Sequence, residues 1–426
     1  MNDGSQDKPE ALCLGDPVQA AQAAHGAGMR AVLFVDDEPI VLMSLKRILH
    51  PLAGKWDMLF AASAREALEL MSARHVDAVV TDLSMPGLDG AELLRRTMRQ
   101  HPDAVRFLLS GYSEEEVQGR SLAPAHRFFT KPCDEKRLVE ALGQAMDARA
   151  YVTNALVLER IGLPLLPEIV RLVAFELDRE APDIEEIAAM VARDAALGQA
   201  ILTLVDAQHR ARQRPARTVR QAVLSLGLGA IQPVILFLSL FERFASAGVH
   251  TYSLPMLKSH CLRSAAIARA IAKDMALGQA AADWAYSAAL LHDVGKLLLE
   301  VLYASECRAI LEEVRADNRR VSEVEAEQLG LTHAQVGAYL LGLLGLPEPV
   351  VRAVAEHHAS APARRGFHAQ DAVYFANVLD HSLFVFNASY ARPEPDPERL
   401  AALGAEHRLE QWKKLVLDLD LGPDGV

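Results

Sequence analysis

Four short apolar runs in the first third of the chain each end in a polar residue that a loop follows. The runs span residues 31–35, 78–81, 105–109 and 127–130, and the polar residues that follow them are Asp36 with Asp37, then Asp82, Ser110 and Lys131. Such runs are typical of buried strands, and the helical patterns between them predict five βα units and a parallel sheet. One polar strand end is ordinary. Four in this order predict a site, because open α/β sheets place their chemistry at the carboxyl ends of the strands.

The residue types at these strand ends suit the transfer of a phosphoryl group. Three crowded carboxylates repel one another, and Mg²⁺, which prefers oxygen ligands, would neutralise them. Asp82 would then act as the nucleophile that forms an acyl phosphate. Lys131 offers a point charge and Ser110 a hydroxyl group to the phosphoryl oxygens.

The same residues resemble the receiver domain of two-component response regulators. The resemblance rests on the acidic pair, on Asp82 followed by Met85-Pro86 and Asp89-Gly90, on Ser110-Gly111 and on Lys131-Pro132, and it covers residues 29 to 148. It implies a flavodoxin-like (βα)5 fold and a phospho-accepting Asp82 that is supplied by a sensor histidine kinase or a phosphotransfer protein. It also implies that Asp37, Asp82 and the backbone carbonyl of Ser84 hold Mg²⁺, that Asp36 acts through water, and that Phe128 is the switch residue.

Composition narrows the partners of the chain. Its 426 residues, 51% of them hydrophobic, are enough for two or three domains. The formal net charge of −12 disfavours a nucleic-acid-binding output domain, so we expect no DNA partner. The four cysteines are isolated, as expected of reduced thiols in a cytoplasmic protein. The longest apolar run, residues 234–241, is far shorter than the roughly 20 residues of a spanning helix, so no membrane partner is expected.

The chain pattern predicts an α/β domain with a parallel sheet, the receiver-like domain, followed by an all-α helical domain. We assign residues 1–28 to a disordered tail, 29–134 to the receiver-like domain, 135–160 to its last helix and a linker helix, 161–390 to the helical output domain, and 391–426 to a Pro-rich link with a C-terminal helical extension. Capping boxes predict helix starts at Ser63 with Glu66, Ser113 with Glu116, Thr218 with Gln221, Ser322 with Glu325, and Thr332 with Gln335.

Residues 135–160 contain one Gly and no Pro, so a single helix is expected there. Its apolar positions fit two interpretations. One is a coiled-coil seam, which Arg149 interrupts. The other is a connecting helix that packs on its own domains.

Six residues of the helical part are candidates for a metal site: His260, His292, Asp293, His333, His357 and His358. Histidines and a carboxylate that converge in a helical bundle can hold one or two transition metals, and two metals can activate water for phosphoester hydrolysis. The alternative is that the buried imidazoles satisfy one another and nearby carbonyls as polar groups of the core.

In order and context, these residues resemble the HD superfamily of metal-dependent phosphohydrolases, and more closely the HDOD (HD-related output) domain. The matching segments lie within residues 158 to 360: Leu163–Ile169, Ala192–Leu197, Ala222–Gly227, His333–Gly337, and Leu346-Pro347 followed by His357-His358. The chain departs from the active cyclic-dinucleotide phosphodiesterases called HD-GYP at three points. Asn377 stands where they have an aspartate ligand, Met256 stands where they have a glutamate, and no Gly-Tyr-Pro loop follows His358.

An asparagine amide is a weaker ligand than a carboxylate, so we expect little bound iron, manganese or zinc in the histidine pocket. The resemblance then implies a non-catalytic output that docks an unknown downstream protein, and it leaves a homodimer open. The alternative is an enzyme, a receiver-controlled HD-type phosphohydrolase that acts on a cyclic dinucleotide or another phosphoester. A helical dimerisation scaffold is a third interpretation.

Overall fold

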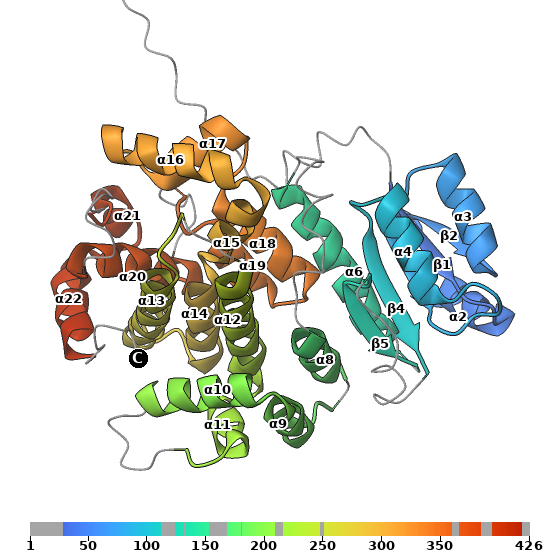
Figure 1. The fold of residues 1–426 in the computed structure, drawn as a ribbon, viewed down its shortest axis with the longest axis horizontal. Helices are drawn as coiled ribbons and strands as arrows, with labels where there is room; N and C mark the ends of the chain where they lie inside the picture. Colours follow the sequence, from blue (N-terminus) through green and yellow to red (C-terminus); the bar gives the residue numbers. More distant parts are fainter. Residues whose placement is uncertain are drawn as a thin grey trace, which may run out of the picture.

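The computed structural model describes residues 29–111, 124–131, 133–152, 168–179, 181–208, 216–247, 251–359, 366–384 and 394–419. It confirms the expected fold class, an α/β sheet domain followed by an all-helical region (Figure 1). The predicted tail, residues 1–28, lies outside the described residues.

The sheet of the described residues has five parallel strands in the order β2-β1-β3-β4-β5, which is the flavodoxin-like order. The strands are β1 (Arg30–Val35), β2 (Trp56–Ala61), β3 (Ala78–Asp82), β4 (Val105–Ser110) and β5 (Arg127–Thr130). The helices and 3₁₀ turns are α2 (Pro39–Leu49), η1 (His50–Leu52), α3 (Ala64–Ala73), α4 (Gly90–Gln100), α6 (Glu135–Ala148) and η2 (Arg149–Tyr151).

Side chains alternate between the two faces of this sheet, and each face has its own hydrophobic core. Phe34, Val80 and Phe107 share one core cluster with residues of α2 and α6. Leu33 and Val79 belong to the other, with residues of α3 and α4. The sheet is thus covered on both faces, as expected of a parallel sheet.

The helical region begins beside the sheet and continues to residue 419. Its elements are α8 (Glu168–Leu177), α9 (Ile184–Arg193), α10 (Ala195–Gln208), α11 (Val219–Leu226), α12 (Leu228–Ala247), α13 (Leu254–Asp274), α14 (Gln279–Leu291), α15 (Val294–Leu302), α16 (Ala304–Asp317), α17 (Val321–Leu329), α18 (His333–Leu343), α19 (Glu348–Ala355), α20 (Ala369–Leu383), α21 (Pro397–Ala402), η4 (Glu406–Arg408) and α22 (Leu409–Asp418).

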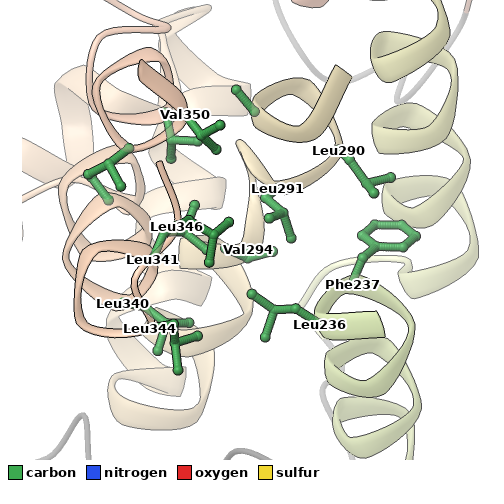
Figure 2. Packing of buried hydrophobic residues seen from close by; sticks show 14 of the residues in the cluster. Leu236, Phe237, Leu290, Leu291, Val294, Leu340, Leu341, Leu344, Leu346 and Val350 are labelled. Carbon is green, nitrogen blue, oxygen red and sulfur yellow. The ribbon is translucent and has the colours of Figure 1, made fainter. Parts of the chain in front are cut away.

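Helix α12 is the one described helix that is long and apolar enough to cross a membrane, over Leu228–Ser246. Of an 18-residue segment within this stretch, 67% is buried inside the protein. Figure 2 shows why: Leu236 and Phe237 of α12 face Leu290 and Leu291 in the centre of the helical region. Packing against neighbouring helices therefore accounts for its apolar surface.

Four of the five predicted capping boxes lie in described residues, and three of these four are confirmed as helix starts, whereas Ser113 with Glu116 lies outside the described residues. The side chains of Ser63, Thr218 and Thr332 each accept a hydrogen bond from a backbone N–H three residues later. The fourth is wrong. Helix α17 begins at Val321 after Arg320, so Ser322 lies inside the helix, and the carboxylate of Glu325 binds His333 instead. The close pair between this carboxylate and a buried imidazole stabilises the protein more than a helix cap at the surface would.

The single helix predicted for residues 135–160 is wrong within the described residues. Helix α6 ends at Ala148, a 3₁₀ turn follows, and Val152 has an extended backbone. Arg149 is the physical reason, because its guanidinium turns back to the sheet domain and pairs with Asp77 at 3.0 Å and with Asp103. Leu138, Leu142, Ala145 and Val152 are buried in the chain's own core, so they form no coiled-coil seam.

The last described segment, residues 394–419, packs against α13 and α20. Arg399 pairs with the buried Asp371 of α20 at 2.9 Å. The indole N–H of Trp412 donates to Asp274 of α13 at 2.9 Å, and its ring lies 5.1 Å from that of Phe375. The helix that carries Asn377 is therefore held in place from its outer side.

Candidate functional site

The strand register brings the predicted acidic residues together at one edge of the sheet. Val35 of β1 pairs with Thr81 of β3, so Asp36 and Asp82 follow side by side. Both side chains are buried, with exposures of 1% and 8%. The Nζ atom of Lys131 lies 2.6 Å from Asp36 Oδ2 and also forms an ion pair with Asp82 Oδ1. One ammonium thus bridges two buried carboxylates.

The remaining predicted residues surround this bridge. The backbone N–H of Ser84 donates to Asp82 Oδ2 at 2.7 Å, and that of Lys131 donates to the carbonyl of Ser110 at 2.7 Å. Phe128 is buried, and Asp37 is half-buried beside Asp36. Every predicted residue of this site therefore lies at the predicted edge of the sheet.

Charge at this edge favours a further cation. Burial raises the pKa of Asp82, and the hydrogen bond and charge of Lys131 offset only part of the rise. Burial alone would lower the pKa of Lys131, but its hydrogen bonds to Asp36 and Asp82 outweigh this, and the net shift is upward. Three carboxylates facing one ammonium fit a divalent ion with oxygen ligands, for which Asp37, Asp82 and the Ser84 carbonyl are the residues available.

All six candidate residues of the helical region converge in one buried cluster. They come from α13, the α14–α15 junction, the start of α18 and the turn after α19, and all are buried except the half-buried His358. We call these six residues (His260, His292, Asp293, His333, His357 and His358) the histidine cluster. They form two groups, each with ligand atoms within 4.8 Å of one another: His260, His292 and Asp293, and Asp293, His333, His357 and His358.

The carboxylate of Asp293 lies between the two groups. Its Oδ2 is 3.7 Å from His260 Nε2 and 3.6 Å from His292 Nε2. Its Oδ1 is 3.3 Å from His333 Nε2 and 3.9 Å from His357 Nε2. Each oxygen of one carboxylate thus faces a different set of ring nitrogens, an arrangement suited to bridging two cations.

Close packing of α15 and α18 sets this geometry. A Cβ atom on Gly295 would lie 1.9 Å from the carbonyl oxygen of His333, so only glycine lets the two helices approach this closely. Figure 2 shows Leu291 and Val294, the residues that flank His292-Asp293, packed toward Leu341 and Leu346. Apolar neighbours on both sides hold the dipeptide in place.

Hydrogen bonds on the far side of the rings orient four histidines. Nδ1 of His292 lies 2.7 Å from the carbonyl of Ala289, and Nδ1 of His357 lies 2.7 Å from the carbonyl of Val354. A carbonyl only accepts hydrogen bonds, so these nitrogens carry the proton. His260 and His333 place Nδ1 at 2.6 Å from the carboxylates of Asp380 and Glu325. Each Nε2 is left as an electron-pair donor in the neutral ring.

In these tautomers, ring nitrogens that carry electron pairs face one another, and a cation between them removes the repulsion. His260 Nε2 and His292 Nε2 lie 3.0 Å apart, and so do His333 Nε2 and His358 Nε2. In the first pair both neutral rings point an electron pair at the other. Either an additional proton or a metal ion between them satisfies the pair. A metal would in addition engage His357 Nε2, a buried atom without a hydrogen-bond partner among the described residues.

Burial disfavours the additional protons at most positions. It lowers the pKa of His292 to about 4 and holds those of His357 and His358 well below the ordinary range. Burial also opposes the charge on Asp293, but Lys296, 2.7 Å away, holds the pKa of that carboxyl well below its usual range. At His333 burial is outweighed by the charge of Glu325 and by hydrogen bonds to Asp293 and Glu325, so the pKa of this ring is raised. His292, His357 and His358 as neutral imidazoles, with the ionised carboxylate of Asp293, are a donor set for Zn²⁺, Fe²⁺ or related ions.

Comparison with known proteins gives the same division of the chain. A family model described as response regulator receiver domain matches residues 32–143, and one described as HDOD domain matches residues 163–360. The chain contains a response regulator receiver domain followed by an HDOD domain. The strand-end carboxylates belong to the first domain and the histidine cluster to the second, although Asn377 and Asp380 lie beyond the HDOD match.

Similar proteins are known for each domain. The receiver domain is 33% identical over 117 residues to the hydrogenase transcriptional regulatory protein HoxA of Bradyrhizobium diazoefficiens, covering 27% of this chain and 24% of that protein. It is 36% identical over 129 residues to the sensor kinase CckA of Brucella abortus, covering 30% of this chain and 13% of that protein. The chain therefore spans a quarter or less of the length of these two relatives.

Solved structures resemble each domain in turn. An HDOD domain protein of unknown function from Geobacter sulfurreducens is 22% identical, covers 66% of this chain and 94% of that chain, and has a TM-score of 0.49. The signal receiver domain of an HD domain-containing protein from Pseudomonas fluorescens Pf-5 is 32% identical, covers 28% of this chain and 96% of that chain, and has a TM-score of 0.27.

Sequence reasoning missed several residues of the HDOD pocket. Asp380 binds His260 and also accepts from Arg263 Nε at 2.6 Å, and the ring of His381 lies 4.4 Å from that of His260. The signal available was helical spacing, because Asp380 and His381 follow Asn377 by three and four residues and so share its face. Met256 is 39% exposed and is not among the cluster residues.

A pocket of about 120 Å³ leads to the cluster. Its inner wall includes the buried His357 and Asn377 and the half-buried His358 and His381, and Arg319 and Arg320 also line it. Lys296 also lines the pocket. The histidine cluster is therefore accessible through this opening. The charged side chains that line it are three cations and one carboxylate, that of Glu394.

Proposed function

We propose that this protein is a response regulator that accepts a phosphoryl group on Asp82 and passes the signal to its HDOD domain. The observation that carries the proposal is the Lys131 ammonium shared by the buried carboxylates of Asp36 and Asp82 at the end of β3. A carboxylate nucleophile beside a fixed ammonium suits acyl phosphate formation. Mg²⁺ would neutralise the carboxylates, and the donor would be a sensor histidine kinase or a phosphotransfer protein.

Labelling with a small phosphodonor tests this assignment. We expect the wild-type protein to be labelled in the presence of Mg²⁺, Asp82→Asn to remain unlabelled, and Asp37→Ala to fail through lost metal binding. Asp89→Asn is the matched control, because Asp89 caps α4 in the same loop and asparagine caps equally well. Labelling of Asp82→Asn at the wild-type level would overturn the assignment.

We further propose that the HDOD domain binds one or two divalent transition metals in the histidine cluster. The departures at Asn377 and Met256 favoured a pocket without bound metal, and the ion pair of Asp293 with Lys296 is compatible with that interpretation. Four rings whose Nδ1 atoms face acceptors, and whose Nε2 atoms converge on one carboxylate, favour metal binding more strongly. Metal analysis of the purified protein tests it, and His292→Ala provides the baseline.

Two outputs are compatible with such a centre. In the first, the HDOD domain docks a downstream protein without catalysis, and the net charge of −12 supports a partner other than DNA. In the second, the centre hydrolyses a phosphoester that enters by the pocket, whose lining cations Lys296, Arg319 and Arg320 are each paired with a carboxylate. Bound metals would supply activated water to that reaction.

Hydrolysis of a cyclic dinucleotide with added metal separates the two outputs. Turnover that His292→Ala abolishes supports the second. Metal uptake without turnover, together with capture of one partner that depends on phosphorylation, supports the first. For either output we propose a cytoplasmic location.

A further inference from the structure

The last strand and the last helix of the receiver domain pack directly on the HDOD domain. Figure 1 shows α6 between the sheet and the helical region, with α8 beside β5. Helix α18 contacts both α6 and η2. The side chain of Gln144 on α6 donates to the carbonyl of Leu346, just beyond the end of α18. The two domains are therefore in contact through α6, β5, α8 and α18.

Arg127 of β5 lies at the centre of this contact. Its side chain is 7% exposed and forms a bidentate pair with Asp178 after α8, with Nε to Oδ2 at 3.1 Å and Nη2 to Oδ1 at 2.6 Å. Its guanidinium also stands over the rings of Phe107 and Phe129. Gly345, two residues after α18, lies so close that a Cβ there would be 2.5 Å from Arg127 Cζ.

Phe128, the next residue along β5, points to the opposite face of the sheet. There it belongs to a core cluster that also includes Phe175 of α8. One face of β5 thus lies against Phe175 of α8, and the other is held by Asp178, the residue that follows α8. A displacement of Phe128 moves the strand that positions Arg127.

Helix α18 connects this contact to the histidine cluster. His333 is its first residue and lies against Asp293, while its last turn contacts the receiver domain at Ala148. Eleven residues of α-helix span about 16 Å. Close glycine contacts hold it at both ends, Gly295 against His333 and Gly342 against Ala148. A shift at one end is therefore transmitted along a rigid element.

We propose that α18 couples the phosphorylation state of Asp82 to metal binding in the histidine cluster, with Arg127 as the contact through which β5 acts on α18. This inference rests on the proposed phosphorylation of Asp82 and on the proposed metal centre. A phosphoryl group on Asp82 adds charge and strong acceptors at the end of β3. The response at Phe128 displaces β5, loosens the hold of Arg127 on Gly345 and Asp178, and lets His333 leave its position.

Linkage between the two sites provides the test. The dissociation constant of Co²⁺ is measured on the full chain by its visible absorption, in excess Mg²⁺, with and without beryllofluoride as a phosphoryl mimic. We expect beryllofluoride to weaken Co²⁺ binding by about 5- to 150-fold, the usual range for coupled sites. Because linkage is reciprocal, Co²⁺ should weaken beryllofluoride binding by the same factor. The His292→Ala protein supplies the baseline for Co²⁺ bound elsewhere.

The variant Arg127→Gln tests whether the coupling between the two sites passes through Arg127. We expect this variant to bind Co²⁺ and beryllofluoride separately, with a coupling factor close to one. Arg220→Gln is the matched control, because it removes another Arg–carboxylate pair, with Glu185, at an exposed position within the HDOD domain. Its coupling factor should equal that of the wild type. If Arg127→Gln does not fold, Gln144→Ala removes a milder contact of the same interface.

The outcomes separate the proposals. Absence of phosphodonor labelling overturns the assignment of Asp82, and absence of Co²⁺ uptake overturns the metal centre, each together with this inference. If labelling and Co²⁺ uptake are normal but the Co²⁺ affinity is the same with and without beryllofluoride, the coupling alone is wrong. An Arg127→Gln protein that keeps the full factor overturns the role of Arg127.

Discussion

Glu325 Oε2 accepts two hydrogen bonds from His333, one from the backbone N–H at 2.9 Å and one from ring Nδ1 at 2.6 Å. The carboxylate is buried, and it comes from α17, whereas His333 begins α18. It sets both the tautomer and the direction of the ring. Carboxylates in this position orient metal-binding imidazoles and increase their basicity.

Glu325→Gln should therefore weaken metal binding. An amide supplies less negative charge to His333 Nδ1, and loss of such a partner lowers metal affinity by about 10- to 100-fold. Titration with Co²⁺, followed by visible absorption, measures the change. Glu323→Gln, on the exposed side of the same helix, is the control and should bind as the wild type does. Equal affinities of Glu325→Gln and the wild type would show that the carboxylate has only a structural role.

The sequence pattern was sufficient for residues whose position follows from strand or helix ends. Asp36 and Asp82 meet because both follow parallel strands in register, and a strand pattern contains that information. His292 and Asp293 were found because they interrupt an apolar helix end. Glu325 was misassigned because a serine three residues before a glutamate also matches a capping box. Only the packing of α17 on α18 decides between these two uses.

Contacts between distant segments could not be predicted in this way. The pair of Arg127 with Asp178 joins residues 51 positions apart in two domains, and nothing local distinguishes either side chain from a solvated one. Asp380 binds His260 across 120 positions. Such contacts depend on how helices are placed relative to the sheet, and hydrophobic periodicity carries no information about that placement.

Asn377→Asp should make the histidine cluster bind metal more tightly and the metal-free protein less stable. Asn377 Oδ1 is buried, and no described residue forms a hydrogen bond with it. A carboxylate there adds charge compensation for a cation, for which we expect about tenfold tighter Co²⁺ binding. Without metal, it is an unpaired buried charge, which costs about 3–5 kcal/mol.

Thermal unfolding with chelator and with Co²⁺ measures both effects of this substitution. The variant should melt below the wild type with chelator and regain the difference with Co²⁺. Asn377→Leu removes the amide oxygen at similar volume and should bind Co²⁺ no more tightly than the wild type. Lower melting of Asn377→Asp that Co²⁺ does not reverse would argue against a ligand position.

Gly342→Ala should destabilise the contact between the two domains. The added Cβ would lie 2.3 Å from the Cβ of Ala148, an atom that cannot rotate away. Overpacking of this kind costs about 1–3 kcal/mol. Gly143→Ala on α6 is the matched control, because its Cβ meets nothing within 4 Å and alanine favours a helix over glycine by about 0.5–1 kcal/mol. Denaturant unfolding should therefore shift in opposite directions for the two variants.

The contribution of His75 to stability should fall as the pH rises above neutrality. His75 Nε2 lies 3.4 Å from Asp103 Oδ2, and the hydrogen bond to Asp103 raises the pKa of His75 above 6.5 although partial burial acts against it. A raised pKa in the folded state means that the stabilisation is complete below pH 6.5 and is lost as the pH passes the folded pKa. The stability difference between the wild type and His75→Gln should be larger at pH 6 than at pH 8.5 in denaturant unfolding. A difference independent of pH would exclude the charged form of His75 as its source.

The hydrophobic core cluster that includes Phe107 and Leu142 of the receiver domain also includes Leu341 and Val351 of the HDOD domain. Modular regulators diversify when one receiver replaces another ahead of an unchanged output domain. Such an exchange is harmless where a flexible tether joins the parts. Here a foreign receiver would bring a new surface against α18, and the recipient would have to repack its own interior. The two domains of this protein should therefore be inherited together, with substitutions at the contact accumulating in pairs.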